Sequence, residues 1–191
     1  AKPTQPADPQ PTDVLMSMFE SCLSGSPLNA ALQTKIGGYD ISADITLKLD
    51  VEHPENIVLS AVTDNGIRLT YANGKIFAAI NDVKLRASVA DIPAALQQLG
   101  TEIRIPEFDL SLLGQNLANV MSAITLERTE NTATVRVPVS FENVDIELIV
   151  NGKKTDENSY AFTDATVTVN GVTIYIKSQE KTIEPLDTSD D

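Results

Sequence analysis

The chain has 191 residues, of which 42% are hydrophobic, and its formal net charge at pH 7 is −13. This length and apolar content are typical of one globular domain with a real core, and they exclude wholesale disorder. The negative charge repels phosphate backbones and anionic membrane surfaces, so we expect no nucleic-acid partner. No stretch approaches the roughly 18 consecutive apolar residues of a membrane-spanning helix, so we expect no transmembrane segment.

Prolines are concentrated at the amino end, where residues 1–12 (AKPTQPADPQPT) hold four of the ten. Such a segment stays extended, which predicts a Pro-rich linker or tether. A tether here suits an exported lipoprotein whose lipidated cysteine lies immediately upstream of Ala1. A frayed terminus fits the composition equally well.

A first helix is predicted over residues 13–24, with Thr12 as its cap and Gly25 as its terminator. Its apolar residues fall on one face at helical spacing: Leu15, Met18, Phe19, Cys22 and Leu23. Because Cys22 lies inside this stripe, we interpret it as a buried core thiol rather than a nucleophile.

Asn-Gly dipeptides at residues 65–66, 73–74, 151–152 and 170–171 separate segments that alternate apolar and polar residues. Asn-Gly between alternating strands is the strongest short-range hairpin signal, because both turn residues tolerate positive φ. Together with the alternation, these turns predict strands over 41–52, 57–64, 67–72, 75–81 and 83–89, and later over 124–129, 132–141, 143–150, 159–169 and 172–178.

Two helices are predicted between the strand clusters, over 91–99 and 110–124. Pro138 falls inside a predicted strand and indicates an edge strand or a bulge. The last residues, 179–191, carry several carboxylates and predict an acidic, disordered tail after a single domain over 13–178.

Catalytic and metal-binding motifs are absent from the sequence. His53 is the single histidine, which excludes histidine-based triads and multi-histidine metal sites, and CxxC, P-loop and GxGxxG motifs do not occur. We therefore expect no enzyme, no cofactor and no metal site.

The order of elements resembles the LolA/LppX-type family of bacterial envelope carriers. The Pro-rich leader before Val14–Leu23, the hairpins of Tyr71–Val89 feeding Asp91–Leu99, and the second meander from Thr132 to Lys177 carry the resemblance. It implies an α+β fold in which a large curled antiparallel sheet, a half-barrel, has helices covering its concave face. Family members hold lipid or acyl chains between sheet and helices, which implies a lipid or acylated ligand, export to the periplasm or cell surface, and a lipid anchor.

The candidate cavity lining is aliphatic, as acyl-chain binding requires: Leu47, Leu49, Leu69, Ile80, Leu85, Leu117, Val120, Met121, Val137 and Leu148. A solid core is the alternative, and the protein would then be a surface-exposed interaction module with a protein partner in the envelope.

Overall fold

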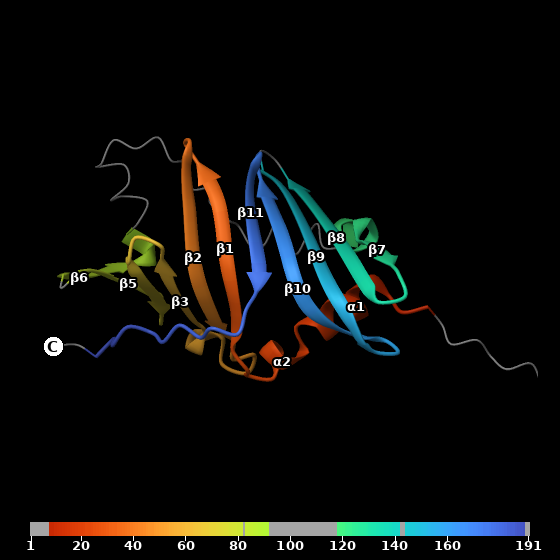
Figure 1. Ribbon diagram of the computed structural model, residues 1–191, viewed down its shortest axis with the longest axis horizontal. Coiled ribbons are helices and arrows are strands. Elements are labelled where there is room, and N and C mark those ends of the chain that lie inside the picture. Colours follow the sequence, from red (N-terminus) through yellow and green to blue (C-terminus); the bar gives the residue numbers. More distant parts are fainter. Residues whose placement is uncertain (1–7, 82, 92–117, 142–143, 190–191) are drawn as a thin grey trace, which may run out of the picture.

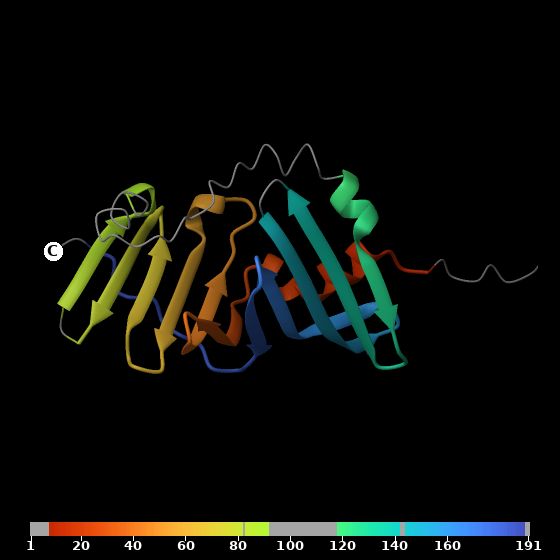
Figure 2. The same cartoon turned by 90° about the horizontal axis from the view of Figure 1, so that it is seen from above.

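A computed structural model describes residues 8–81, 83–91, 118–141 and 144–189. In it the strands form one open sheet of eleven strands in the order β6-β5-β4-β3-β2-β1-β11-β10-β9-β8-β7. Every neighbouring pair is antiparallel, and β6 and β7 lie at opposite ends of the sheet (Figures 1 and 2). The prediction of a large antiparallel sheet is confirmed.

The strands have the following bounds: β1 Leu28–Ile36, β2 Tyr39–Lys48, β3 Val58–Thr63, β4 Arg68–Ala72, β5 Lys75–Ile80, β6 Val83–Ser88, β7 Thr125–Arg128, β8 Thr132–Phe141, β9 Val144–Asp156, β10 Ser159–Val169 and β11 Val172–Ser178. The short 3-10 helices η1 and η2 cover Pro54–Asn56 and Val89–Asp91.

The amino-terminal helix is split in two, α1 Pro11–Met18 and α2 Glu20–Leu23, at Phe19, whose φ of −111° is not helical. Capping by Thr12 was predicted wrongly. Pro11 opens α1, where its missing N–H costs nothing, and Gln10 precedes it without a side-chain cap. Cys22 is buried, as predicted. Of the two later predicted helices, the described part of the chain holds Asp91, which ends η2, and residues 118–124, of which 118–123 are helical; residues 92–117 lie outside it.

The Asn-Gly dipeptides do not all make turns. Asn73-Gly74 and Asn170-Gly171 have positive φ at both residues, as a type I′ turn requires. Asn151-Gly152 instead lies inside β9, which continues to Asp156, so the predicted turn there is wrong. A Cβ on Gly152 would lie 2.7 Å from Met18 Cε, so this glycine permits the close approach of α1 to the sheet.

Strand β1 was not predicted, and it joins the two halves of the sheet. It pairs with β2 on one side and with β11 on the other, from Ala30↔Ser178 to Thr34↔Ile174. Leu28, Leu32 and Ile36 alternate with polar residues, so the strand signal was present, although Ala30 and Ala31 weaken it.

Pro138 lies in β8 beyond Arg136, the residue at which the pairing with β7 ends. This part of β8 is paired with β9 on its other side, so the proline needs no N–H toward β7. The predicted edge strand or bulge is therefore met only locally: β7 and not β8 is the edge strand of the sheet, but Pro138 lies beyond the stretch of β8 that pairs with β7.

The buried core lies at one end of the sheet, where α1 packs across β8, β9 and β10. Its members are Val14, Met18, Ala133, Val135, Val150, Tyr160 and Ala165. Ser17 Oγ accepts a hydrogen bond from the Tyr160 N–H at 3.2 Å, and the Phe19 and Phe162 rings lie 5.3 Å apart between centroids. These contacts fix α1 on the sheet.

The C-terminal segment is docked on the sheet, in contrast to the predicted disordered tail. Residues 179–187 cross the strands on the face opposite α1 (Figure 1), and Ile183 and Leu186 are buried. Their N–H groups donate to Thr46 Oγ1 at 2.7 Å and Thr70 Oγ1 at 2.9 Å.

Candidate ligand-binding face

One face of the sheet is predominantly apolar. In antiparallel pairing, directly opposed residues lie on the same face, so the register defines rows of side chains across the strands. One row runs Leu28, Leu47, Leu59, Tyr71 and Ile76 from β1 to β5. Other rows of the same face contain Ile45, Ala61, Leu69, Ala78 and Leu85, and, on the far side of β1, Val137, Leu148 and Val167. We call this the apolar face.

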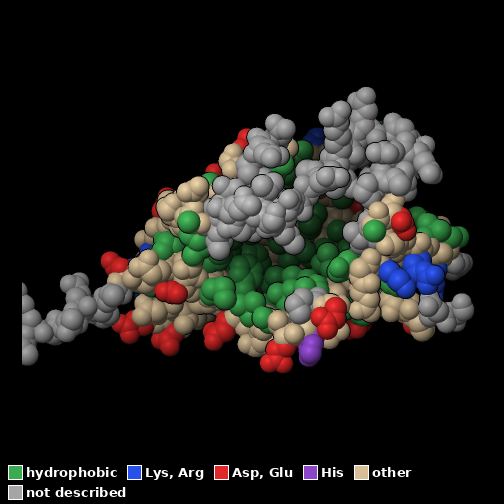
Figure 3. Space-filling model, turned by 180° about the vertical axis from the view of Figure 1, so that it is seen from behind, with side chains coloured by type: hydrophobic (Ala, Val, Ile, Leu, Met, Phe, Trp, Pro, Cys, Tyr) green, Lys and Arg blue, Asp and Glu red, His purple; other side chains and the backbone are tan. Residues whose placement is uncertain are grey.

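The apolar face is hollowed. Figure 3 shows hydrophobic side chains gathered in a depression on this side of the molecule, with charged side chains below it and to either side. Antiparallel sheets usually cover such a face with other elements, because exposed apolar area costs free energy in water.

Among the described residues, the buried core cluster takes in one end of the apolar face. Val137 and Leu148 pack against the core cluster beneath α1, together with Leu126 and Ile176. We call β8–β10 the packed wing.

The other end keeps its apolar side chains exposed. Leu59, Leu69, Ile80 and Leu85 retain 38%, 36%, 43% and 56% of their accessible surface, and Val83 retains 59%. We call β3–β6 the exposed wing. Large apolar side chains in adjacent rows with this much exposure form a contiguous apolar patch, which makes this wing the candidate binding surface.

The predicted lining residues are distributed unevenly over these regions. Leu69, Ile80 and Leu85 lie on the exposed wing, Leu47 in β2 and Leu49 directly after it, and Val137 and Leu148 on the packed wing. Val120 and Met121 lie in the helical residues 118–123, where Met121 is 48% exposed, and Leu117 lies outside the described residues. The structure thus places Leu69, Ile80, Leu85 and Met121 among the exposed residues and Val137 and Leu148 against the core cluster, and it leaves Leu47, Leu49 and Val120 half-buried outside that cluster.

The polar face of the exposed wing is held by the C-terminal segment. Thr46, Ser60 and Thr70 form one row across β2, β3 and β4, and all three are buried. Three residues of an extended chain span roughly 9–10 Å, which is also the distance across two strand spacings. The spacing of residues 183 and 186 therefore matches the spacing of β2 and β4, so that one residue contacts each strand. The Arg68 guanidinium adds a hydrogen bond to the Glu184 carbonyl at 3.2 Å.

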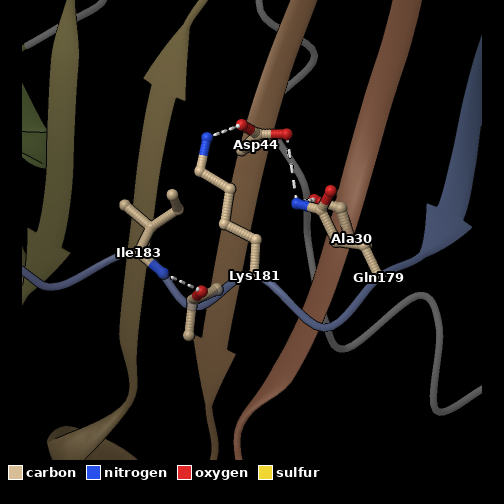
Figure 4. Close-up of polar contacts among 6 residues, drawn as sticks. Ala30, Asp44, Gln179, Lys181 and Ile183 are labelled. Atoms are coloured by element: carbon tan, nitrogen blue, oxygen red, sulfur yellow. Dashed lines mark hydrogen bonds and ion pairs between the residues drawn. The ribbon is translucent and has the colours of Figure 1, made fainter.

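Asp44 in β2 anchors the start of this segment (Figure 4). It pairs with the Lys181 ammonium and accepts a hydrogen bond from Gln179 Nε2 at 3.1 Å. The hydrogen bond from Lys181 lowers the pKa of Asp44 most, and the hydrogen bond from Gln179 lowers it further. Gln179 Nε2 also donates to the Ala30 carbonyl of β1 at 3.1 Å. Sequence reasoning missed these contacts, because Ile183 and Leu186 are two isolated apolar residues among polar ones, and two residues are too few to establish a helix or strand period.

Acid-base and metal chemistry have little support on this face. Burial raises the pKa of the Cys22 thiol, which disfavours the reactive thiolate. Among the described residues, no three His, Cys, Asp or Glu side chains are placed to hold a metal ion. Nor does that part of the chain hold a helix of the length and apolarity that a membrane crossing demands. What the apolar face offers a ligand is aliphatic contact area.

Comparison with known proteins yields similar folds only. No family model and no curated protein matches the chain. The crystal structure of the Mycobacterium tuberculosis lipoprotein LppX matches with a TM-score of 0.48 and 12% sequence identity, over 88% of this chain and 92% of that one. LprF from Mycobacterium bovis matches with a TM-score of 0.44 and 9% identity, over 91% and 94% of the two chains.

Proposed function

We propose that the protein binds lipid or acyl chains on the exposed wing of the apolar face. The observation that carries this proposal is the contrast between the wings: over β8–β10 the apolar face contributes Val135, Val150 and Ala165 to the buried core under α1, with Val137 and Leu148 partly buried beside it, whereas over β3–β6 the same face keeps large aliphatic side chains exposed. Each methylene that a ligand buries there contributes about 0.8 kcal/mol, so an acyl chain gains affinity from area alone. The docked C-terminal segment stabilises the exposed wing from its other face, which leaves the apolar face available.

The predicted tether over residues 1–12 is shortened by α1, which begins at Pro11, and the remaining Pro-rich residues 1–10 support a second part of the proposal, namely that the protein is exported and held at an envelope membrane by a lipid anchor. An extended spacer separates a folded domain from its anchor by up to about 3 Å per residue. A lipobox cysteine encoded directly before Ala1, behind a signal peptide, is the expected observation. A coding sequence that lacks both the signal peptide and the lipobox cysteine would contradict the proposed export and anchoring, and would leave the binding proposal intact.

Ligand binding can be tested with a fluorescent acyl probe. We expect the full chain to take up the probe saturably and to release lipid on organic extraction. Ile80→Phe places a ring on the exposed wing and should reduce uptake with little change in stability. Val62→Phe adds the same ring to β3 on the polar face, and should leave uptake unchanged.

In the packed wing we expect the opposite effect of an added ring on stability, and the same experiment tests it. Val137→Phe overfills a region already packed against the core, so it should cost about 1–3 kcal/mol in the free energy of unfolding. If Ile80→Phe is equally destabilising and no acyl probe binds, the core is solid throughout. The interaction-module interpretation would then replace acyl binding.

A further inference from the structure

Two neighbouring hairpins end together at one rim of the sheet. Because β1 pairs with β11, the turn between β1 and β2 and the turn between β10 and β11 lie side by side at the upper rim in Figure 1. The paired residues of β1 and β11 end at Thr34↔Ile174, so both hairpins continue beyond their mutual contact. A recess of about 640 Å³ lies between them, lined by Thr34, Ile41, Val172 and Tyr175 among others. We call residues 35–40 and 169–175 the rim tip.

The rim tip exposes large apolar side chains. Tyr39 is 78% exposed, Tyr175 59%, Ile36 50% and Val172 38%. Gly37 and Gly38, both with positive φ, make the tight turn that holds Ile36 and Tyr39 at the end of the hairpin. By register Ile36, Tyr39 and Val172 lie on the apolar face, whereas Tyr175 lies on the opposite face of β11. Four exposed groups of this size at the ends of two adjacent hairpins exceed the scattered surface residues of an ordinary soluble protein.

The rim tip is also electrically neutral in a chain of net charge −13. Its charged side chains are Lys35 and Asp40, whose Nζ and Oδ1 atoms lie 3.7 Å apart, and residues 169–175 carry none. The strong negative field of the protein disfavours an anionic surface, whereas a neutral tip meets no such repulsion from a zwitterionic one. Tyrosine places an apolar ring and a hydroxyl together, which suits the boundary between hydrocarbon and water.

The apolar face continues into the rim tip. Ile36 ends the alternating series Leu28, Leu32, Ile36 of β1, and Val172 begins the series of β11 that contains Ile174 and Ile176. An acyl chain that leaves the face along these strands therefore reaches the rim tip without crossing a charged border. This continuity favours a membrane over a protein as the occupant, and in this respect the inference rests on the proposed function.

We propose that the rim tip docks into the interface of a zwitterionic lipid bilayer, with Ile36 and Tyr39 inserted. Removal of one buried aliphatic or aromatic side chain changes such an equilibrium by roughly ten-fold or more. A tip of this size predicts weak and reversible association rather than permanent anchoring.

The sequence contains no tryptophan, so Tyr39→Trp in the full chain is a unique reporter. With phosphatidylcholine vesicles we expect a blue shift of its fluorescence and quenching by brominated phosphatidylcholine. Val51→Trp is the matched control, because Val51 is an exposed apolar residue (60%) outside the rim tip. Its fluorescence should not change. The double variant Ile36→Ser with Tyr39→Ser should reduce vesicle co-flotation at least ten-fold, with the melting temperature unchanged.

The result that overturns the proposal is a Tyr39→Trp emission that is unaffected by vesicles, or affected no more than that of Val51→Trp. Binding that requires added phosphatidylglycerol also overturns it, because charge would then drive association. Uptake of an acyl probe from solution separates the two proposals. The double variant should keep acyl-probe uptake. If the tip inserts into vesicles but the protein takes up no acyl probe, the proposed function is contradicted and the docking surface is still supported.

Discussion

At the scale of single residues, Asp44 shows how one carboxylate fastens a segment that has no regular structure. It lies in β2 and holds Lys181 and Gln179, which begin the C-terminal segment. Because these contacts lower the pKa of Asp44, its carboxylate favours the folded state over the unfolded one.

We expect the stabilisation by Asp44 to depend on pH. A carboxyl group with a lowered folded-state pKa contributes stability above its unfolded pKa of about 3.9 and loses it as the pH falls through the folded value. In urea titrations, the wild type should be more stable than Asp44→Asn at pH 7, and the difference should disappear in acid.

Asp64→Asn removes one negative charge at an exposed site and serves as the control for net charge. Equal behaviour of the two variants would show that overall charge, and not the contact with Lys181, causes the effect.

At the scale of elements, the two wings of the sheet are stabilised from opposite sides. The packed wing is covered by α1 on the apolar face, whereas β2–β4 are held on the polar face by the segment that buries Ile183 and Leu186. This division explains how β3–β6 can keep aliphatic side chains exposed and still belong to a stable sheet.

Leu186→Ala and Ile183→Ala test this role of the C-terminal segment. Each should lower the free energy of unfolding by about 1–3 kcal/mol, because each removes buried aliphatic area at a site that is close to the surface. Val51→Ala, at an exposed position, should have little effect. Hydrogen exchange should show protection of the Ile183 and Leu186 amides, and fast exchange at both would mean that the segment is undocked in solution.

The elements that the sequence predicted well are those with a local signal. Period-two alternation and the turns at Asn73-Gly74 and Asn170-Gly171 located most strands, including β10 and β11. Gly152 misled the turn prediction, because a glycine is needed at this position for a long-range contact with Met18 and not for a turn. The C-terminal segment could not be predicted, because its order depends on a long-range match. The spacing of Ile183 and Leu186 fits the distance between β2 and β4, and the segment alone carries no signal of this.

The candidate site was predictable only in part, for the same physical reason. Alternation identifies Ile80 and Val137 alike as apolar-face residues. Which of them remains exposed depends on where α1 packs, and that is decided by the close approach at Gly152 and the hydrogen bond between Ser17 and Tyr160.

At the scale of the whole molecule, charge is strongly unbalanced, with 27 acidic and 14 basic side chains. Self-repulsion of this kind destabilises the compact state and is screened by salt, since the Debye length falls from about 30 Å at 0.01 M to about 8 Å at 0.15 M.

We therefore expect the melting temperature at pH 7 to rise by about a few degrees when sodium chloride is increased from about 0.01 M to about 0.15 M. Near the isoelectric point of about 4.4 the rise should vanish. A fall with salt at pH 7 would show that attractive pairs such as Lys181–Asp44 outweigh the repulsion.

The pairing of β1 with β11 has a consequence for the order of events during synthesis. Thr34 and Thr173, which are hydrogen-bonded across this pair, are 139 residues apart in the sequence. Closure of so long a loop is slow, and a ribosome releases the C-terminal residues last. Strands β1–β6 therefore emerge with an open edge at β1 and without the segment that covers Thr46 and Thr70. Until translation ends, the nascent chain displays an unpaired strand beside an apolar surface, which is the form of a folding intermediate that chaperones bind.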